Sequence, residues 1–217
     1  MTSAPARRPG RRNDVDVPTV LIDTAERMFG ESSVDAVSLR AVAREAGVAP
    51  AAVTYHFPTK EALAAAVVSR RGAPVGEATR ERLAALAREP GEVTALAVVR
   101  AILDPLAAVV EEDPEAGLNW LRVMTWAATS RYSSFYDRLE DRSVNALFAQ
   151  AVSRATDWPE RPMRRRTGIA MFAMLTALST ADRQGYTSAV DARGIDPEFL
   201  ADLAAFTAAG LTAPLSD

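Results

Sequence analysis

The chain has 217 residues, of which 48% are hydrophobic and 24% charged, and it contains no cysteine. This composition is that of a globular protein with one large domain or two small ones, and it excludes disulfides, a thiolate nucleophile and a cysteine-ligated zinc site. The net charge of −3 hides an asymmetry, because residues 1–72 carry ten basic and eight acidic groups whereas the remainder carries fifteen basic and twenty acidic groups.

The basic excess of residues 1–72 is where a nucleic-acid surface is expected, and part of it comes from the run RRPGRR at 7–12. We expect residues 1–14 to be a disordered Arg-rich arm and not a secretory signal, since they contain no apolar run. The arm can be a solubilising tail or a flexible segment that contacts a phosphate backbone or a minor groove. The uncharged stretch at 167–181 is shorter than the roughly 20 residues that span a bilayer, so a buried helix is expected. The lack of cysteine fits the reducing cytoplasm, so a cytoplasmic protein is expected.

After residue 14 the sequence predicts helices and turns throughout, and therefore an all-α fold. A first helix is expected over residues 18–30, with Asp14 or Asp16 as its cap. Its apolar residues recur at helical spacing on one stripe: Val20, Leu21, Ala25, Met28 and Phe29.

Three short helical segments follow, separated by residues that interrupt a helix. Ser38 can cap the second helix, and Gly47 ends it. Pro50 suits the first turn of the third helix, which Pro58 ends because the residue before a proline disfavours helical geometry. Thr59 can cap the fourth. The second and third helices around Gly47 form a helix-turn-helix, a unit that places its second helix in the DNA major groove.

The helix that enters a groove must present side chains that are small or that reach base edges. Ala49, Ala51, Ala52 and Thr54 are small, and Tyr55 is long. The third helix therefore has the surface expected of a recognition helix. The stretch TYHFPTK at its end also holds the only histidine and the only lysine of the sequence.

The run VSLRAVAREAGVAPAAVTYHFPTKEAL at 37–63 resembles the DNA-binding signature of the TetR family of bacterial transcriptional regulators. That signature has a Ser or Thr cap, an arginine two residues on, A-x-x-A-G-V, and a short helix ending in aromatic–His–aromatic, then Pro or Gly, Ser or Thr, and Lys-Glu. The resemblance is specific over residues 17–66 and architectural beyond them. It implies a three-helix DNA-binding head, followed by a larger helical domain that binds a small ligand and forms a homodimer.

The residues and the resemblance together predict the DNA contacts. Arg40 matches an arginine that reaches a guanine or a phosphate, and Tyr55 and His56 match side chains on the phosphate backbone. Lys60 follows the Thr59 cap, where a cation is unfavourable unless a phosphate binds the same helix start. The full predicted set is Arg40, Ala51, Thr54, Tyr55, His56, Thr59 and Lys60.

Each role has an ordinary alternative. Arg40 can be an exposed helix arginine, Tyr55 can pack on the core, His56 can be a buried imidazole and Lys60 can be merely solvated. The third helix also departs from the family pattern and offers few hydrogen bonds to bases, so Arg40 and DNA shape are expected to carry more of the specificity. The departures are Ala49, Pro50, Ala52 and Thr54.

The segment RRGAPVG at 70–76 is predicted to break or kink the chain. We place there the boundary between a DNA-binding domain at 15–72 and a ligand-binding and dimerisation domain at 73–217. Pro105 is expected to kink one helix of the second domain. The helices predicted in this domain cover residues 77–88, 92–111, 115–130, 133–156, 160–183 and 196–212.

The family architecture implies a pocket for a small apolar or amphipathic ligand in the second domain, where methionine and aromatic side chains can repack around a guest. Each of these side chains can equally be ordinary core. The predicted pocket residues are Leu103, Leu106, Trp120, Met124, Phe148 and Phe172. The polar groups that could orient the ligand are Asn119, Arg122, Thr125 and Tyr132.

The last two helices are predicted to pair with the same helices of a second chain, as the family does, and a two-fold dimer would recognise a roughly palindromic operator. Alternatively, their apolar stripes complete the core of one chain. The predicted interface residues are Met171, Leu175, Phe199, Leu203 and Phe206.

The predicted function is a repressor that a small molecule releases from its operator. A DNA-binding regulator or activator without a small ligand is the alternative. An enzyme is not expected, because the single histidine lies in the DNA motif and no Ser-His triad can form in the second domain. No cofactor or metal is predicted, since the acidic cluster at 111–115 is better explained as a solvated loop.

Overall fold

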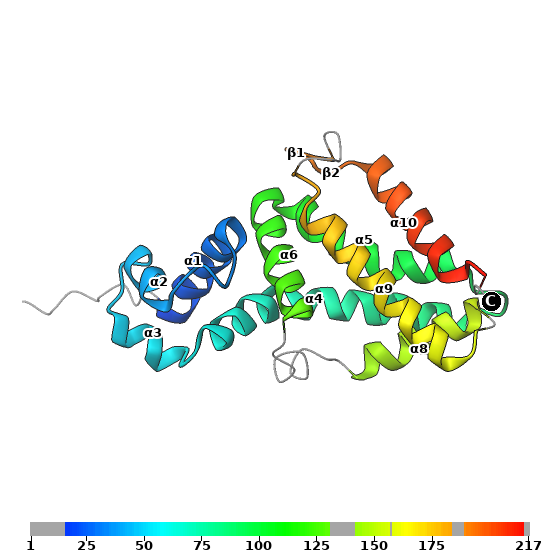
Figure 1. The fold of residues 1–217 in the computed structure, drawn as a ribbon, viewed down its shortest axis with the longest axis horizontal. Helices are drawn as coiled ribbons and strands as arrows, with labels where there is room; N and C mark the ends of the chain where they lie inside the picture. Colours follow the sequence, from blue (N-terminus) through cyan, green and yellow to red (C-terminus); the bar gives the residue numbers. More distant parts are fainter. Residues whose placement is uncertain (1–15, 131–141, 157, 184–188, 215–217) are drawn as a thin grey trace, which may run out of the picture.

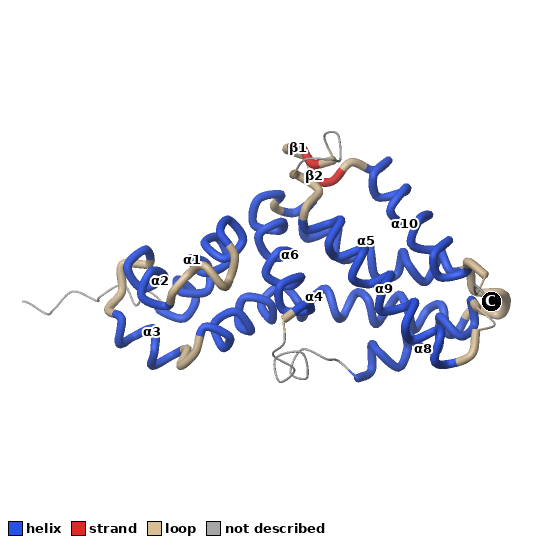
Figure 2. Tube along the Cα trace, viewed as in Figure 1, coloured by secondary structure: helices blue, strands red, loops and turns tan. Residues whose placement is uncertain are grey.

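The computed structural model describes residues 16–130, 142–156, 158–183 and 189–214 (Figures 1 and 2). The predicted arm at 1–14 and Tyr132 lie outside these residues. The described part is helical apart from one antiparallel pair of two-residue strands, β1 (Val190–Asp191) and β2 (Gly194–Ile195). The predicted all-α fold is confirmed.

The predicted DNA-binding head lies at one end of the molecule and consists of α1 (Val17–Ser32), α2 (Leu39–Glu45) and α3 (Pro50–His56) (Figure 1). These bounds agree with the prediction to within a few residues. Asp16 stands at the N-cap of α1, but its carboxylate accepts a hydrogen bond from the hydroxyl of Thr19 at 2.6 Å instead of capping the backbone.

The fourth helix, α4 (Lys60–Arg88), runs without interruption from the head into the rest of the molecule. Of the predicted break or kink at 70–76, the break is therefore wrong, and Pro74 lies inside the helix. Packing holds the helix together on both sides of the proline, because Val68 and Leu83 are buried. Their burial outweighs the loss of one backbone hydrogen bond to the proline ring. The expected domain boundary thus falls within a helix that belongs to both parts.

The larger helical body is built on α4. Its further helices are α5 (Ala95–Glu112), α6 (Pro114–Thr129), α8 (Arg142–Ala155), α9 (Glu160–Ser179) and α10 (Pro197–Thr212). They match the predicted ranges closely, except that residues 133–141 of one predicted helix lie outside the described part. Helix α5 continues through Pro105, which is buried.

The strand pair was not predicted, since two residues per strand give no alternating pattern. Its turn uses Gly194 at φ 115°, a left-handed value that favours glycine. A Cβ at this position would lie 3.0 Å from the Cα of Glu111, so the turn also packs closely on the end of α5. The strand pair leads the chain from α9 into α10 (Figure 1).

One hydrophobic core extends from the head into the body. It joins Leu21, Phe29 and Leu63 of the head region with Leu103 and Trp120 of the body. A second cluster, which includes Leu83 of α4 together with Ala151 and Val152, holds α8 against α4. The continuous core means that the head is packed on the body through side chains as well as through the shared helix α4.

Helix α6 stands between the head and the remaining body helices, and it packs closely on α1 (Figure 1). The closest approach is at Gly30, which is buried in α1. A Cβ on Gly30 would lie 2.3 Å from the side-chain oxygen of Asn119 and 2.5 Å from the Asn119 Cα. Only a glycine fits at this crossing without moving α6, because the nearest obstruction includes backbone.

We expect Gly30→Ala to destabilise the fold by about 1–3 kcal/mol, the usual cost of overpacking a tight contact. Gly76→Ala is the matched control, because Gly76 lies in α4 and a Cβ there meets nothing within 4 Å. Removing a helix-interior glycine should stabilise this control by roughly 0.5–1 kcal/mol. Denaturant unfolding of both variants checks the pair, and an unchanged midpoint for Gly30→Ala would contradict the close crossing.

Candidate nucleic-acid interface

The helix-turn-helix is fixed locally by the capping residues that the sequence predicts. Ser38 accepts a hydrogen bond from the Ala41 amide at 3.2 Å, and Thr59 accepts one from the Ala62 amide at 3.1 Å. Gly47 takes the left-handed φ of 68° that ends α2. Ala49 stands at the N-cap of α3 and provides no side-chain cap, as its departure from the family pattern implies.

The recognition helix is held on the head by one buried face. Val53 of α3 is 1% exposed, and Val42 and Ala43 of α2 are fully buried beside it in the same core. An ion pair of 2.6 Å between Arg27 and Glu45 ties α1 to α2 at the surface. These contacts fix one face of α3 inward and leave the opposite face uncovered.

The uncovered face carries the side chains that the sequence predicts to contact DNA. Tyr55 is 82% exposed, and Ala51, Thr54 and His56 are exposed with it. The rings of Tyr55 and His56 meet edge to face, with centroids 5.0 Å apart. Packing of Tyr55 or His56 in the core, which the sequence left open, is therefore wrong.

Thr54 is satisfied within its own helix. Its hydroxyl donates to the carbonyl oxygens of Ala51 at 3.2 Å and Pro50 at 3.4 Å. The hydroxyl proton is thus used by the backbone, which leaves the methyl group as the part of Thr54 suited to an apolar contact.

The two predicted cations of the interface differ in their surroundings. Arg40 lies exposed in the first turn of α2 and forms no ion pair within the described part of the chain. Lys60 is half-buried, and its ammonium donates a hydrogen bond of 3.0 Å to the backbone carbonyl of Asp35. Lys60 is therefore more than a solvated lysine, because it is anchored to the turn between α1 and α2. Thr59 is exposed beside it.

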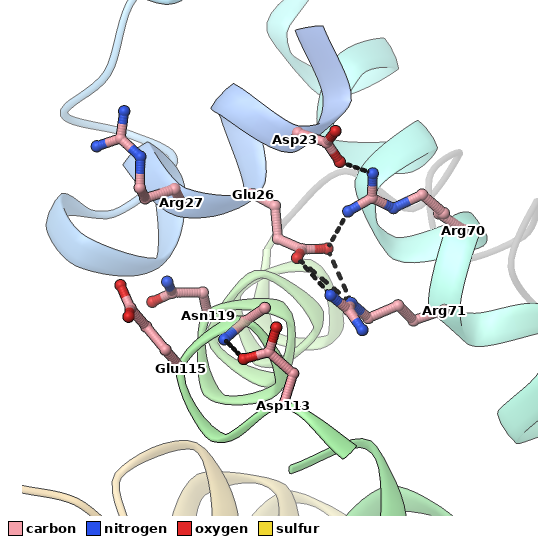
Figure 3. A pocket seen from close by; sticks show the side chains of 9 residues that line it. Asp23, Glu26, Arg27, Arg70, Arg71, Asp113, Glu115 and Asn119 are labelled. Carbon is pink, nitrogen blue, oxygen red and sulfur yellow. Dashed lines mark hydrogen bonds and ion pairs between the residues drawn. The ribbon is translucent and has the colours of Figure 1, made fainter. Parts of the chain in front are cut away.

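A charged cavity of about 290 Å³ lies where the head meets the body (Figure 3). It is lined by Asp23, Glu26, Arg27, Arg70, Arg71, Asp113, Glu115, Ala116 and Asn119. The central group is Glu26, which is 3% exposed and accepts hydrogen bonds from Arg71 at 3.1 to 3.3 Å and from Arg70 at 3.2 Å. The two arginines thus link α4 to α1 through a buried carboxylate.

Arg70 also pairs with Asp23, as Figure 3 shows. Burial alone would lower the pKa of Arg70, but the hydrogen bond that Arg70 donates to Asp23 and the charge of Glu26 outweigh it and raise the pKa above its ordinary value. Sequence reasoning missed this cluster and interpreted Arg70 and Arg71 as part of a break. The available signal was Glu26, a carboxylate beside the apolar stripe of α1.

The predicted pocket residues differ in burial within the described part of the chain. Leu103, Leu106 and Trp120 are at most 2% exposed, and the Trp120 indole donates to the Val68 carbonyl at 3.0 Å. Met124 and Phe148 are half-buried, whereas Phe172 is 43% exposed on α9. A second cavity, of about 430 Å³, lies beside Glu160, Arg161 and Arg164. The six predicted pocket residues line neither this cavity nor the charged cavity at the head.

The predicted polar groups of the pocket bind other helices. Arg122 pairs with Asp182 at 2.6 Å and donates to the Ser179 carbonyl at 3.2 Å and to Asn119 at 3.1 Å. The hydroxyl of Thr125 donates to the Leu175 carbonyl at 3.3 Å. These bonds hold α6 against α9, so in this arrangement Arg122 and Thr125 act between helices.

The residues predicted at the dimer interface lie on α9 and α10, which pack side by side. Phe206 is 75% exposed, Met171, Phe199 and Leu203 are half-buried, and Leu175 is 3% exposed. Two further apolar side chains of α9 are exposed, Ile169 at 62% and Phe172 at 43%. The sequence placed Phe172 in the pocket and did not single out Ile169.

None of the helices in the described part of the chain is both long and apolar enough to cross a membrane. Among the same residues, no group of three or more histidine or acidic side chains is arranged to hold a metal ion.

The comparison with protein families matches residues 21–67, the head and the start of α4, to "Bacterial regulatory proteins, tetR family". The head of this chain is therefore of the TetR type. A head of this type indicates a DNA-binding transcriptional regulator rather than an enzyme. No curated protein sequence matches the chain.

Solved structures of TetR-type regulators share the whole fold. A TetR-family transcriptional regulator from Streptomyces coelicolor is 23% identical, with 90% of this chain and 95% of that chain covered and a TM-score of 0.52. Mycobacterium smegmatis AmtR is 16% identical, with coverages of 97% and 91% and a TM-score of 0.53. A TetR-like regulator from Rhodococcus sp. RHA1 is 15% identical, with coverages of 93% and 96% and a TM-score of 0.54.

Proposed function

We propose that this TetR-family regulator is a ligand-responsive repressor that binds a palindromic operator as a homodimer. The observation that carries the DNA-binding part is the uncovered face of α3, where Tyr55 is 82% exposed on a helix whose opposite side is buried. A tyrosine exposed beside a histidine offers an apolar ring and a hydroxyl, a combination suited to a partner surface. Duplex DNA is the partner that the helix-turn-helix fits.

The contacts divide into base contacts and phosphate contacts. Ala51 and the methyl group of Thr54 are suited to thymine methyl groups. Tyr55 and His56 at the end of α3, and Lys60 at the start of α4, are placed for the phosphate backbone. Thr59 lies between them at the N-cap of α4. Arg40 is the side chain in this set that can form a bidentate bond with a guanine.

The homodimer is supported by the surface of α9 and α10. Ile169, Phe172 and Phe206 form exposed apolar positions on these adjacent helices. Helix α10 is apolar on its buried side as well, at Ala204 and Leu211. A helix that is apolar on both sides requires a cover on both, and a second copy related by a two-fold axis provides it.

Release by a ligand would operate as a population shift. A ligand that binds better to one spacing of the two heads lowers operator affinity by its differential binding to the two states. The continuous helix α4 and the contact of α6 with α1 connect the body to the head. These connections support transmission from the body to the DNA surface.

A second candidate is a DNA-binding regulator or activator without a small-molecule ligand. It is favoured by the dense packing of Leu103, Leu106 and Trp120, which are at most 2% exposed and line neither of the two cavities. For the ligand-responsive function, half-buried Met124 and its neighbours must repack around a guest.

The DNA contacts are tested by Arg40→Ala and Lys60→Ala. Arg40→Ala should cost about 1–3 kcal/mol of operator binding and relax selectivity at one base pair. Lys60→Ala should weaken binding to all sequences and reduce the salt slope by about one, because one phosphate contact is lost. Fluorescence anisotropy with a duplex selected from a random pool, at several salt concentrations, measures both. Unchanged affinity and salt slope for Lys60→Ala would rule out its phosphate contact.

The dimer is tested by Phe206→Glu, which places a charge in the proposed apolar contact. We expect a monomer in analytical ultracentrifugation, together with weaker operator binding, because a single head contacts only a half-site. Leu96→Glu is the matched control, since Leu96 is an exposed leucine, 44% accessible, on α5 and not on α9 or α10. A dimer that persists in Phe206→Glu at the same protein concentration would contradict the interface.

The response to ligand is tested by titrating small apolar and amphipathic molecules into the operator complex. A ligand of the body should lower operator affinity by about 5–150-fold, the usual range of coupling between two sites. A molecule that binds tightly and leaves operator affinity unchanged would contradict this response. It would favour the second candidate function.

A further inference from the structure

We propose that Trp126 of α6 is a positioning residue for DNA binding, because it restrains the carboxylate of Asp35 and so keeps the Lys60 ammonium available for a phosphate. The inference rests on the proposed phosphate contact of Lys60. Trp126 lies in the body, 66 positions after Lys60 in the sequence, and would thus be a body residue that influences DNA binding.

Asp35 is bonded from both sides. Its carboxylate oxygen Oδ2 accepts a hydrogen bond of 3.1 Å from the indole Nε1 of Trp126. Its backbone carbonyl accepts the hydrogen bond of 3.0 Å from the Lys60 ammonium. One exposed residue in the turn between α1 and α2 therefore contacts the body through its side chain and the DNA-facing cation through its backbone.

The bond to the carbonyl leaves Lys60 able to bind an anion. An ammonium has three donors, and the Asp35 carbonyl uses one of them. The anchor holds the flexible side chain at the start of α4, where the helix amides favour an anion. A phosphate at this position can be shared by the remaining ammonium donors and the helix start.

The carboxylate of Asp35 is the competitor for the same ammonium. It belongs to the residue that already holds Lys60, so rotation of its side chain can bring an acidic oxygen to the cation. A charge-assisted pair of this kind is stronger than the bond to a neutral carbonyl and would withdraw Lys60 from the phosphate. The Trp126 indole, as a donor to the carboxylate, holds it toward α6 and away from Lys60.

Helix α6 connects this restraint to the body. The same helix is bonded to α9 through Arg122 and Thr125, and to α4 through the Trp120 indole. A displacement of α6 relative to the head therefore lengthens or breaks the bond from Trp126 to Asp35. The DNA-facing cation can in this way respond to the body without a change in the spacing of the two heads.

The test uses Trp126→Phe in the full-length protein, which removes the indole donor and keeps an aromatic ring. Binding to a fluorescein-labelled duplex of random sequence is measured for the wild type and in the Lys60→Ala and Asp35→Asn backgrounds. In the wild type we expect about 2–10-fold weaker binding, the effect of one lost hydrogen bond. In both variant backgrounds Trp126→Phe should have no further effect, since either the cation or the competing charge is absent.

Trp158→Phe is the matched control, because the Trp158 indole also donates one hydrogen bond, at 3.0 Å to the Leu211 carbonyl, but in the body. It should leave binding to the duplex unchanged. Thermal unfolding of each variant checks that it is folded at the temperature of the binding measurement.

The outcomes separate the two proposals. If Lys60→Ala leaves affinity and salt slope unchanged, the phosphate contact of Lys60 is wrong, and the role of Trp126 is overturned with it. If Lys60→Ala weakens binding but Trp126→Phe has no effect, or has the same effect in all three backgrounds, the role of Trp126 alone is overturned.

Discussion

The close crossing of α1 and α6 is the constraint on which the arrangement of head and body depends. Gly30 of α1 lies against Asn119 of α6, and a Cβ at this glycine would meet the Asn119 Cα at 2.5 Å. The crossing fixes the head on the body independently of α4, which connects them covalently. It also brings the far part of α6 to the turn that contains Asp35, where Trp126 forms its hydrogen bond.

The ion pairs around Glu26 also hold the head on the body, but they require the burial of a charged group. A carboxylate that is 3% exposed loses most of its hydration, and Arg70 and Arg71 compensate with several hydrogen bonds. Removal of one partner from such a group leaves an uncompensated buried charge. Substitution of Glu26, Arg70 or Arg71 alone is therefore expected to destabilise the contact between head and body. The crossing at Gly30 therefore sets the distance between α1 and α6, whereas Glu26 sets the position of α4 against α1.

Much of the head was predictable because its signals are local. The caps at Ser38 and Thr59 and the left-handed Gly47 act within a few residues, and each has its predicted place. The break at 70–76 was wrong for the opposite reason. Glycine and proline disfavour a helix locally, but buried side chains on both sides and the pairs from Arg70 and Arg71 hold α4 continuous.

The sequence by itself determined the helical class, the helix-turn-helix and which residues of α3 could meet DNA, because capping and periodicity depend on near neighbours. Only the tertiary structure decided that Tyr55 and His56 are exposed, that Phe172 lies on an outer face, and that Lys60 is bonded to Asp35. These facts depend on contacts between residues far apart in the chain. Helix packing brings such residues together, and short-range sequence patterns do not predict these contacts.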